Sequence, residues 1–390
     1  MKVANNNEYY DRIIYKKNAI SCLRDILLQD EELNNILFIS SNSAFLKYGA
    51  FVINELEALG CHYETLMHSS KFDKYDVEKI VKKFKNISYI VTLGGGGITD
   101  LGKIVAKILG SKLIVIASNP STIAYFTKYS YVDFGNLKKC FKCDFAYKII
   151  VDELIIASAS EDSVVCGRNL IASFWEMYFT LQCNRLLFSI PFDASELKLV
   201  LCKFKDNLEY ISSFTQDSKF VLMDILVDLA FVIKDFSAFE SGNLAFAFLL
   251  EKSQSIKNCN FGTLCLIGQR IMFENYNNFL MQKRLEIITM PDFENLAHNL
   301  QNLKISAKEV KLLQVKRAYA SKKIYKRLNE VKNQLLCLCN NVQNEISTIQ
   351  VGKNIVVDID KCFISLNLIP FLYDTPPLIS IIASTGLMNF

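Results

Sequence analysis

The sequence is poor in residues that interrupt regular structure and has no long apolar run. Its 390 residues include only 15 glycines and 6 prolines, and we find neither an internal repeat nor a flexible linker. The most apolar stretch, residues 220–233, is interrupted by Asp224 and Asp228 and is too short to span a bilayer. These absences exclude repeat and membrane-spanning architectures.

The chain also lacks a strong net charge and a cationic leader. Its formal charge of +4 is too small to indicate nucleic-acid binding by itself. Residues 1–11 are polar and rich in Asn, so we expect no secretion signal and predict a soluble, cytoplasmic protein. The basic segment 304–332 contains Glu309 and Glu330 and its charges spread around the helix, which favours a solvated face. We therefore predict neither a nucleic-acid nor a membrane partner.

Cysteine is abundant, but its arrangement does not indicate a metal or redox site. Without a secretion signal, the 12 cysteines are expected to be reduced and mostly small core residues. Cys140 and Cys143 have a C-x-x-C spacing, and Cys337 and Cys339 offer two further thiols. Alternation over residues 139–147 predicts a strand, in which the first pair of thiols points in opposite directions. A structural role is favoured over zinc.

The length and the apolar share of 51% indicate two domains with large cores. In residues 1–152, apolar runs alternate with helical patterns, which predicts a Rossmann-like parallel sheet with right-handed crossovers. From residue 153 to 390, helical patterns dominate, so we predict an α/β fold with an all-helical second domain. The expected strands are 35–40, 63–67, 89–93 and 112–117. The expected helices are 44–59, 76–85, 98–109, 170–185, 195–213, 219–234, 244–252, 262–279 and 308–342.

The most informative stretch is residues 89–103, in which a buried strand runs into four glycines and then a helical pattern. Strand, glycine turn and helix are the geometry in which backbone N–H groups converge on a phosphate. A tight turn that binds nothing is the alternative. Asp100 and Lys103, which follow the glycines, favour the functional interpretation. Ligands of parallel sheets lie beyond the carboxyl ends of the strands, where residues 94–97 and 118–127 fall.

With these residues the chain resembles the iron-containing alcohol dehydrogenase superfamily, which includes glycerol dehydrogenase and dehydroquinate synthase, and it is most similar to the glycerol-1-phosphate dehydrogenases. The nucleotide signature G-G-G-x-x-x-D-x-x-K is met in full. Similar segments occur at 117–123, 151–155, 240–242 and 372–387. The signature residues are Gly94, Gly95, Gly96, Asp100 and Lys103.

The resemblance implies a dehydroquinate synthase-like fold and a nicotinamide cofactor, NAD or NADP, in a cleft between domains. It places the pyrophosphate on residues 94–97, Gly97 included, and assigns Ser118 and Thr127 to phosphate or nicotinamide. In such proteins an Asp and two His bind zinc or iron, which polarises the reacting carbonyl or alcohol. A homo-oligomer is also expected by this analogy.

The chain departs from the superfamily at the metal. The ligand Asp corresponds to Asn169, the first His to Phe248 (Leu249 if the register slips by one), and the second His to Phe261. The Asp of the substrate loop corresponds to Ile123. The only histidines are His62, His68 and His298, and the first two fall in the nucleotide domain. A neutral amide and two rings are poor partners for a hard dication, so we expect no metal.

Two alternatives to this loss concern thiols and cations. Cys166, Cys259 and Cys265 fall near the expected site, but helical spacing does not bring these thiols together. Without a metal, the developing alkoxide needs another partner. Candidates are Arg168, Lys128 and Tyr129.

Function follows from what is kept and what is lost. Residues 40–42 (Ser-Ser-Asn) stand where relatives often carry an acid on the adenosine ribose, so NADP is as compatible as NAD. One hypothesis is an NAD(P)-dependent oxidoreductase acting on a small, perhaps phosphorylated, polyol or ketone without the usual metal. The alternative is a catalytically silent protein that serves as a nucleotide-binding, regulatory or interaction subunit. A cyclising reaction like that of the synthases would also need a metal.

Overall fold

The computed structural model describes most of the chain and divides it into two compact units. The described residues are 7–29, 35–135, 137–188, 193–237, 241–282, 298, 301–302, 322–347, 349, 355–362, 365 and 378. The first unit comprises residues 1–134, 139–167 and 207–235, and the second comprises 135–138, 168–206 and 236–390. The predicted boundary at 152 coincides with the end of a strand and stays a prediction.

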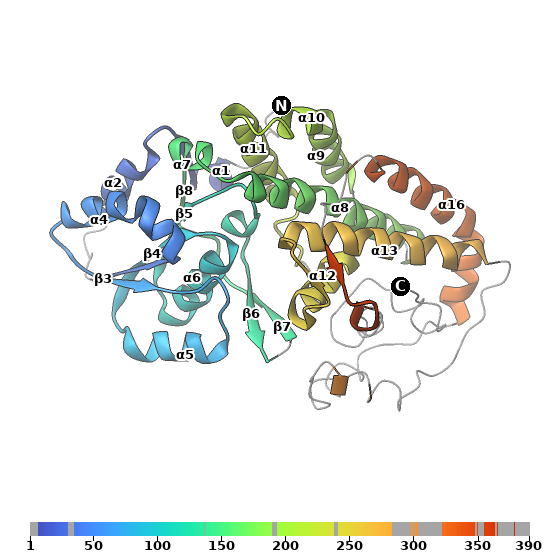
Figure 1. Ribbon diagram of the computed structural model, residues 1–390, viewed down its shortest axis with the longest axis horizontal. Helices are drawn as coiled ribbons and strands as arrows, with labels where there is room; N and C mark the ends of the chain where they lie inside the picture. Colours follow the sequence, from blue (N-terminus) through green and yellow to red (C-terminus); the bar gives the residue numbers. More distant parts are fainter. Residues whose placement is uncertain are drawn as a thin grey trace. The chain divides into compact units, whose positions relative to one another are not determined.

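The first unit is built on a six-stranded parallel sheet (Figure 1). The strands are β1 (Ile13–Lys16), β2 (Asn35–Ser40), β3 (His62–Met67), β4 (Ile87–Gly94), β5 (Lys112–Ala117) and β8 (Lys148–Asp152). Their order is β1-β8-β5-β4-β2-β3, and every neighbouring pair is parallel. The predicted α/β class and the four predicted strands are therefore confirmed.

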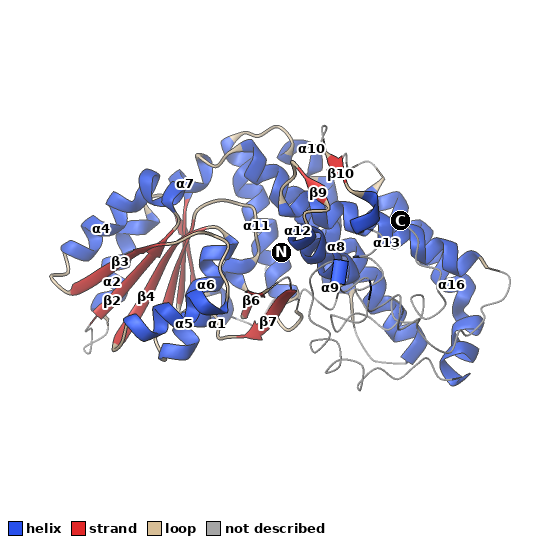
Figure 2. Cartoon of the chain, turned by 60° about the horizontal axis from the view of Figure 1, so that its bottom comes forward, coloured by secondary structure: helices blue, strands red, loops and turns tan. Residues whose placement is uncertain are grey.

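Helices cover both faces of this sheet (Figure 2). Side chains such as Phe38, Val91 and Ile116 point to one face, where they form a core with helical residues including Leu23 and Val52. Helix α6 packs on the opposite face, where Gly102 lies against Thr92 and Leu113. Because the strands are buried on both faces, they appear in sequence as continuous apolar runs.

The other elements of the first unit are mostly short. Its helices are α1 (Asn7–Tyr10), η1 (Ala19–Ser21), α2 (Cys22–Leu28), α3 (Asn42–Ala44), η2 (Phe45–Gly49), α4 (Ala50–Glu57), α5 (Lys74–Lys83), α6 (Gly96–Leu109), η3 (Ala124–Phe126), α7 (Glu153–Ala157), α10 (Leu208–Ile211) and α11 (Gln216–Val232). Two further strands, β6 (Tyr129–Phe134) and β7 (Leu137–Lys142), pair with each other. The expected stop at residue 60 is confirmed, since Gly60 has a φ of +66°.

The second unit is helical, as predicted. Helix α8 (Glu161–Phe188) continues into it from the first unit, and it also contains α9 (Ser195–Asp206), α12 (Gly242–Ser253), α13 (Phe261–Met281) and α16 (Lys322–Ile346). Two-residue strands β9 (Ile256–Lys257) and β10 (Val356–Val357) form an antiparallel pair that the sequence did not reveal. In the part of the chain that the structure describes, no helix is long and apolar enough to cross a membrane. Residues 303–321 and most of the segment 372–387 lie outside the described residues.

The cysteines behave as structural thiols. All 12 are free. Cys140 lies in β7 and Cys143 follows that strand, which is shorter than the expected 139–147. Burial raises the pKa of Cys140 to about 12 and that of Cys143 to about 11, so both favour the unreactive thiol form.

Asp152, at the end of β8, joins the sheet to two helical elements. The carboxylate is buried; its Oδ1 accepts a hydrogen bond from Leu154 N (2.9 Å) and its Oδ2 one from Ile20 N (3.1 Å). One oxygen thus caps α7 and the other satisfies a buried amide next to η1. A single side chain fixes where the chain leaves the sheet.

Replacing this side chain should destabilise the first unit. We expect Asp152→Ala to lower the free energy of unfolding by about 2–4 kcal/mol, because a helix cap is lost and a buried N–H is left unsatisfied. Urea denaturation monitored by circular dichroism measures the change. Asp11→Ala, which removes an exposed carboxylate of the same unit, should change it by less than about 0.5 kcal/mol. Equal effects of the two variants would contradict this role.

Candidate functional site

The turn between β4 and α6 is the candidate ligand site. Gly94 ends the strand, and Gly95 is extended (φ −83°, ψ −165°) immediately before the helix. No side chain caps this 14-residue helix. The amide N–H groups of its first turn therefore have no capping partner, and the positive end of the helix dipole lies beside them. This is the arrangement that the glycine pattern predicted.

The glycines of the turn have different physical reasons. A Cβ on Gly94, Gly96 or Gly97 would come within 2.8 Å of Ile98, 2.9 Å of Thr122 Oγ1 and 2.0 Å of Ser70 O, respectively. These three glycines are required by the packing of the turn itself. A Cβ on Gly95 would meet only Asn119 Nδ2, at 3.8 Å, so Gly95 borders open space. A ligand oxygen that approaches the backbone at this Cβ position would meet Asn119 Nδ2 and no other side chain within 4 Å.

Asp100, Lys103 and Thr127, three predicted cofactor residues, form a buried anchor under the turn. Lys103 Nζ donates to Tyr129 O (2.7 Å), Asp100 Oδ1 (3.3 Å) and Thr127 Oγ1 (3.4 Å). The lysine side chain has no exposed area. The sequence pattern brings the three together, and their contacts tie α6 to β6. Their assignment to the cofactor stays a prediction, and the geometry gives them a role in holding the turn.

Ser118 lies on the neighbouring loop, with a residue that the sequence analysis did not single out. Asn119 Nδ2 donates to Ser118 Oγ (3.1 Å), and Asn119 Oδ1 accepts from Ser121 N (3.1 Å). Nδ2 of this amide lies 3.8 Å from the position that a Cβ on Gly95 would occupy. Its position directly after a buried strand, beside the predicted Ser118, was the available signal. Beneath the loop, burial raises the pKa of Tyr125 to about 12, so its hydroxyl stays protonated.

The start of α8 packs against this loop. A Cβ on Gly167 would lie 1.9 Å from Pro120 O, so only glycine lets the helix approach the loop. Cys166 Sγ lies 3.6 Å from Ser121 O. Close packing against Pro120 O therefore explains why residue 167 is a glycine.

Asn169, at the ligand Asp position, is held in an amide network. It is fully buried, and its Nδ2 donates to Thr263 Oγ1 (3.0 Å). Thr263 Oγ1 donates in turn to Asn260 Oδ1 (2.9 Å). Arg168 Nε lies 3.4 Å from Asn169 Oδ1. Both ends of the amide are engaged, and the side chain joins α8 to the first turn of α13.

The structure brings the two His positions together as a pair of rings. The centroids of Phe248 and Phe261 lie 4.9 Å apart at an interplanar angle of 36°. Leu249, the alternative register, is buried as well. Lys138 Nζ lies 5.1 Å from the centroid of Phe248 and 3.5 Å from Glu251 Oε2. The two rings pack on each other, and the Lys138 ammonium lies over the ring of Phe248.

A zinc or iron ion does not fit the residues present at these positions. Rings and a hydrogen-bonded amide offer none of the imidazole, thiolate or carboxylate donors that such ions need. Among the described residues, no group of three or more His, Cys, Asp and Glu side chains could hold a metal. Of the three thiols in the alternative, burial raises the pKa of Cys259, which favours its neutral thiol form. Ile123, at the substrate-loop Asp position, precedes η3.

Two of the three side chains that could replace the metal as partner of the alkoxide form contacts with Asp235. Lys128 Nζ pairs with Asp235, and Tyr129 OH donates to Asp235 O (2.9 Å). Arg168 is half-buried, and this burial lowers its pKa. Of the three, only Arg168 lies beside a ligand position.

The buried side chain of Glu176 connects α8 with the segment 240–242. It is fully buried in α8, and its Oε2 lies 2.6 Å from Ser241 Oγ and accepts a hydrogen bond from Gly242 N (3.1 Å). Tyr276 OH contacts its Oε1. The carboxyl group thus joins α8, the start of α12 and α13. Glu240, the first residue of the segment 240–242, lies outside the described residues.

The hydrogen bonds around Glu176 indicate that its carboxyl group is protonated. Asn243 Nδ2 donates to Ser173 O (3.0 Å) and Cys265 O (3.2 Å), which turns Asn243 Oδ1 toward Ser241. The single hydroxyl hydrogen of Ser241 then faces two acceptors, Asn243 Oδ1 and Glu176 Oε2. A protonated Glu176 resolves this conflict by donating to Ser241. Burial, which raises the pKa of Glu176, favours the same state.

The raised pKa makes a pH-dependent prediction. Because folded Glu176 holds its proton more tightly than the unfolded chain, its contribution is complete below the ordinary glutamate range and is lost as pH rises. We expect the stability of the wild type relative to Glu176→Gln, which does not titrate, to fall as pH rises above the ordinary glutamate pKa of about 4.3. Urea denaturation at pH values below and above this pKa measures the difference. A relative gain of the wild type with rising pH would contradict a protonated Glu176.

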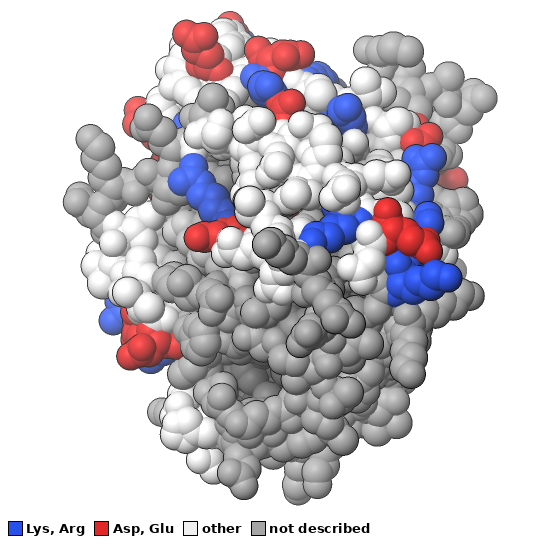
Figure 3. Space-filling model, turned by 90° about the vertical axis from the view of Figure 1, so that its right-hand side faces the viewer, with Lys and Arg blue, Asp and Glu red and all other residues white. Residues whose placement is uncertain are grey.

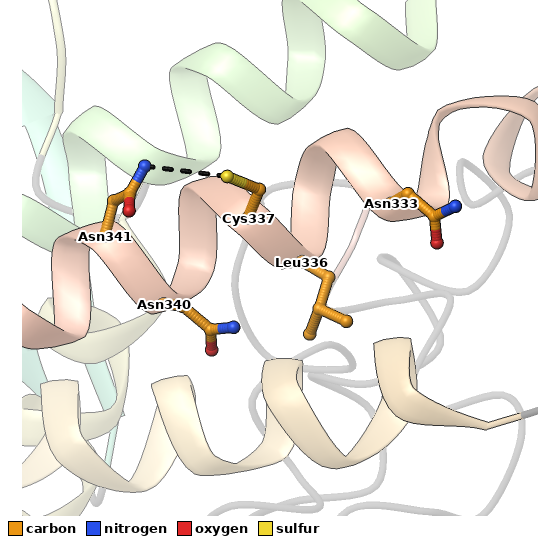
Figure 4. A pocket seen from close by; sticks show the side chains of 5 residues that line it. All are labelled: Asn333, Leu336, Cys337, Asn340 and Asn341. Atoms are coloured by element: carbon orange, nitrogen blue, oxygen red, sulfur yellow. Dashed lines mark hydrogen bonds between the residues drawn. The ribbon is translucent and has the colours of Figure 1, made fainter.

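The described surface includes one pocket and one face with mixed charge. The pocket on α16 is lined by Asn333, Leu336, Cys337, Asn340 and Asn341, with Asn341 Nδ2 3.7 Å from Cys337 Sγ (Figure 4). It contains no charged side chain and no predicted site residue. On the face drawn in Figure 3, basic and acidic side chains of the described residues are interspersed. The absence of a nucleic-acid partner stays a prediction.

Comparison with known families supports the resemblance stated from sequence. A sequence profile of the family described as iron-containing alcohol dehydrogenase matches residues 14–160. This range contains the sheet and the β4–α6 turn. No curated protein matches the chain by sequence.

Solved structures share the fold over nearly the whole chain. An iron-containing alcohol dehydrogenase from Thermotoga maritima aligns over 96% of this chain and 97% of its own, with a TM-score of 0.60 and 14% identity. Glycerol dehydrogenase from Schizosaccharomyces pombe aligns over 88% and 94%, with a TM-score of 0.55 and 13% identity. NADH-dependent butanol dehydrogenase A from Thermotoga maritima aligns over 97% of both chains, with a TM-score of 0.57 and 11% identity. The predicted resemblance to this superfamily is confirmed, and these likenesses concern the fold.

Proposed function

We propose that this chain, which has the fold of the iron-containing alcohol dehydrogenases, binds a nicotinamide dinucleotide at the β4–α6 turn and works without a catalytic metal. It then serves as a dinucleotide-binding subunit that is silent in metal-dependent alcohol oxidation. The observation that carries the proposal is the open space over Gly95 at the uncapped start of α6.

The chemistry of the turn supports the binding half of the proposal. A pyrophosphate needs several N–H donors and a positive dipole end, and the first turn of α6 offers both. Asn119 Nδ2, which lies 3.8 Å from the Cβ position of Gly95, adds a side-chain donor. The Lys103–Asp100–Thr127 anchor keeps the turn rigid, so little ordering is needed when a ligand binds.

The chemistry of the ligand positions supports the metal-free half. Polarising a carbonyl in this fold requires a cation with an open coordination position. Phe248 and Phe261 pack on each other, and the amide of Asn169 is engaged by Thr263. Burying aromatic surface contributes about 1.5–3 kcal/mol per side chain, so the rings stabilise a region that charged ligands would otherwise occupy.

A second candidate is an NAD(P)-dependent oxidoreductase that acts on a small, possibly phosphorylated polyol or ketone without a metal. One observation favours it: Arg168 is half-buried beside Asn169 and keeps a cation at a ligand position. Consumption of NADPH or NADH with dihydroxyacetone or its phosphate, lost in Arg168→Met, would select this candidate. The homo-oligomer expected from the superfamily is part of either proposal, and size-exclusion chromatography with light scattering tests it.

Two neighbouring glycines separate binding from folding. We expect Gly95→Ala to fold normally, because its Cβ has space, and to weaken binding of NADH and NADPH at least about tenfold, because that space is where the phosphate lies. Nicotinamide fluorescence on titration measures binding. The contrasting variant is Gly97→Ala, whose Cβ would overlap Ser70 O. It should lower the free energy of unfolding by about 1–3 kcal/mol or more. Unchanged dinucleotide affinity in Gly95→Ala, or no binding by the wild type, refutes the proposed site.

Rebuilding the ligand set tests the loss of the metal. Purified wild-type protein should contain no stoichiometric zinc or iron by mass spectrometry. The triple variant Asn169→Asp, Phe248→His and Phe261→His should gain zinc affinity, because it restores three ligands in one region. A control with Phe248→Leu and Phe261→Leu opens the same space without ligands and should gain none. Stoichiometric metal in the wild type would overturn the proposal.

A further inference from the structure

Helix α4 and the turn η2 before it have one face in the core and one face exposed. Val52 and Leu56 belong to the core on one side of the sheet, and Phe45 packs against that core. The ring centroid of Phe45 lies 6.0 Å from that of Phe38, and a Cβ on Gly49 would come within 2.6 Å of the Phe45 ring. Close packing thus fixes which face of this helical segment points inward, and the opposite face is left to solvent.

The exposed face carries two large apolar side chains. Leu46 is 85% exposed and Phe51 is 59% exposed, and Ala50 beside them is exposed as well. In a regular α-helix, positions five apart point in well-separated directions. Because η2 is a π-helical turn, which is wider by one residue, Leu46 is rotated toward the side of the helix that carries Phe51. The π turn therefore gathers exposed apolar surface on one side of this segment.

Opposite charges lie before and after this apolar surface. Lys47 is exposed and Glu55 is half-buried, and neither side chain forms an ion pair with any residue that the structure describes. They are about 12 Å apart along the helix axis, which is too far for an ion pair within one chain. The segment thus carries a positive charge at its start, apolar side chains at its centre and a negative charge toward its end.

This arrangement is complementary to itself. When two copies of the segment meet antiparallel around a two-fold axis near Phe51, Lys47 of each copy faces Glu55 of the other, and Leu46 and Phe51 are buried between the helices. A parallel pairing would place like charges opposite each other. We infer that this face of η2 and α4 is the contact surface for a second copy of this chain. The inference rests on the homo-oligomer included in the proposed function and is independent of dinucleotide binding.

Analytical ultracentrifugation over a range of protein concentrations tests the inference. The wild type should sediment as a dimer that dissociates on dilution. Leu46→Glu should raise the Kd of the dimer at least about tenfold, because it places an unpaired carboxylate at the centre of the contact. Ile108→Glu, which makes a similar change at a 53% exposed position of α6, should leave the Kd unchanged. The circular dichroism of both variants should match that of the wild type, since both side chains are exposed.

Exchanging the two charges makes the test specific for this contact. Lys47→Glu and Glu55→Lys should each raise the Kd about tenfold, because each places like charges opposite each other across the two-fold axis. Mixing the two single variants should restore association, because every charge pair between the two chains is then of opposite sign. Raising the salt concentration should weaken the restored dimer, since salt screens exposed ion pairs.

The outcomes separate this inference from the proposed function. A wild type that sediments as a monomer at every concentration overturns the inference and the expected homo-oligomer, and leaves dinucleotide binding intact. A dimer that Leu46→Glu does not weaken, or two charge variants that do not associate on mixing, overturns the assignment of the contact to this face. Failure of the wild type to bind NADH and NADPH refutes the proposed ligand site and leaves the dimer contact standing.

Discussion

The architecture of the first unit depends on the close approach of backbone segments at the β4–α6 turn. Gly97 lets the loop after β3 pack against the turn, and Gly102 lets α6 lie directly on Thr92 of the sheet. A methyl group at either position would push α6 away from its neighbours. Since α6 must lie this close, its first amides emerge at a fixed place on the carboxyl edge. Packing and ligand geometry thus have the same cause.

In the helical unit, buried polar contacts join α8 to the helices α12 and α13. Glu176 links α8 to α12 and α13, and Asn169 links α8 to the start of α13 through Thr263. Gln269 adds a third link, because its Nε2 donates to Ala172 O (2.9 Å) and Ser173 O (3.1 Å). Each contact satisfies a buried group that would be costly to leave unpaired. The helices are therefore positioned by hydrogen bonds and ring packing among the protein's own side chains.

The sequence predicted the parts of the structure in which local pattern and tertiary environment agree. Strands buried on both faces, such as β4 and β5, give continuous apolar runs, and Gly60 marks a left-handed turn. Strand β1 has four residues at the edge of the sheet and is only partly buried, so its pattern carries no signal. The pairing of β9 with β10 joins residues about a hundred positions apart, which no local pattern encodes.

In the candidate site, too, some features were predictable from local sequence pattern and others were not. The run of glycines could be recognised from sequence, and close contacts at Gly94, Gly96 and Gly97 explain three of them. The burial of Lys103 could not be predicted, since a lysine after a phosphate loop has the same spacing whether it points to the ligand or to Tyr129 O. Asn119 was overlooked because a lone amide in a loop has no distinctive spacing; only the position of Gly95 gives it meaning.

A dinucleotide site and a metal site in this fold differ in how many specific side chains they need. A phosphate cradle is made of backbone amides, so any sequence that keeps the glycines and the helix keeps the cradle. A metal site needs three specific side chains, and replacing them leaves the backbone untouched. The rings of Phe248 and Phe261 pack on each other with centroids 4.9 Å apart, so aromatic residues at these positions are compatible with the fold. In this fold, dinucleotide binding is therefore physically separable from the chemistry that a metal supplies.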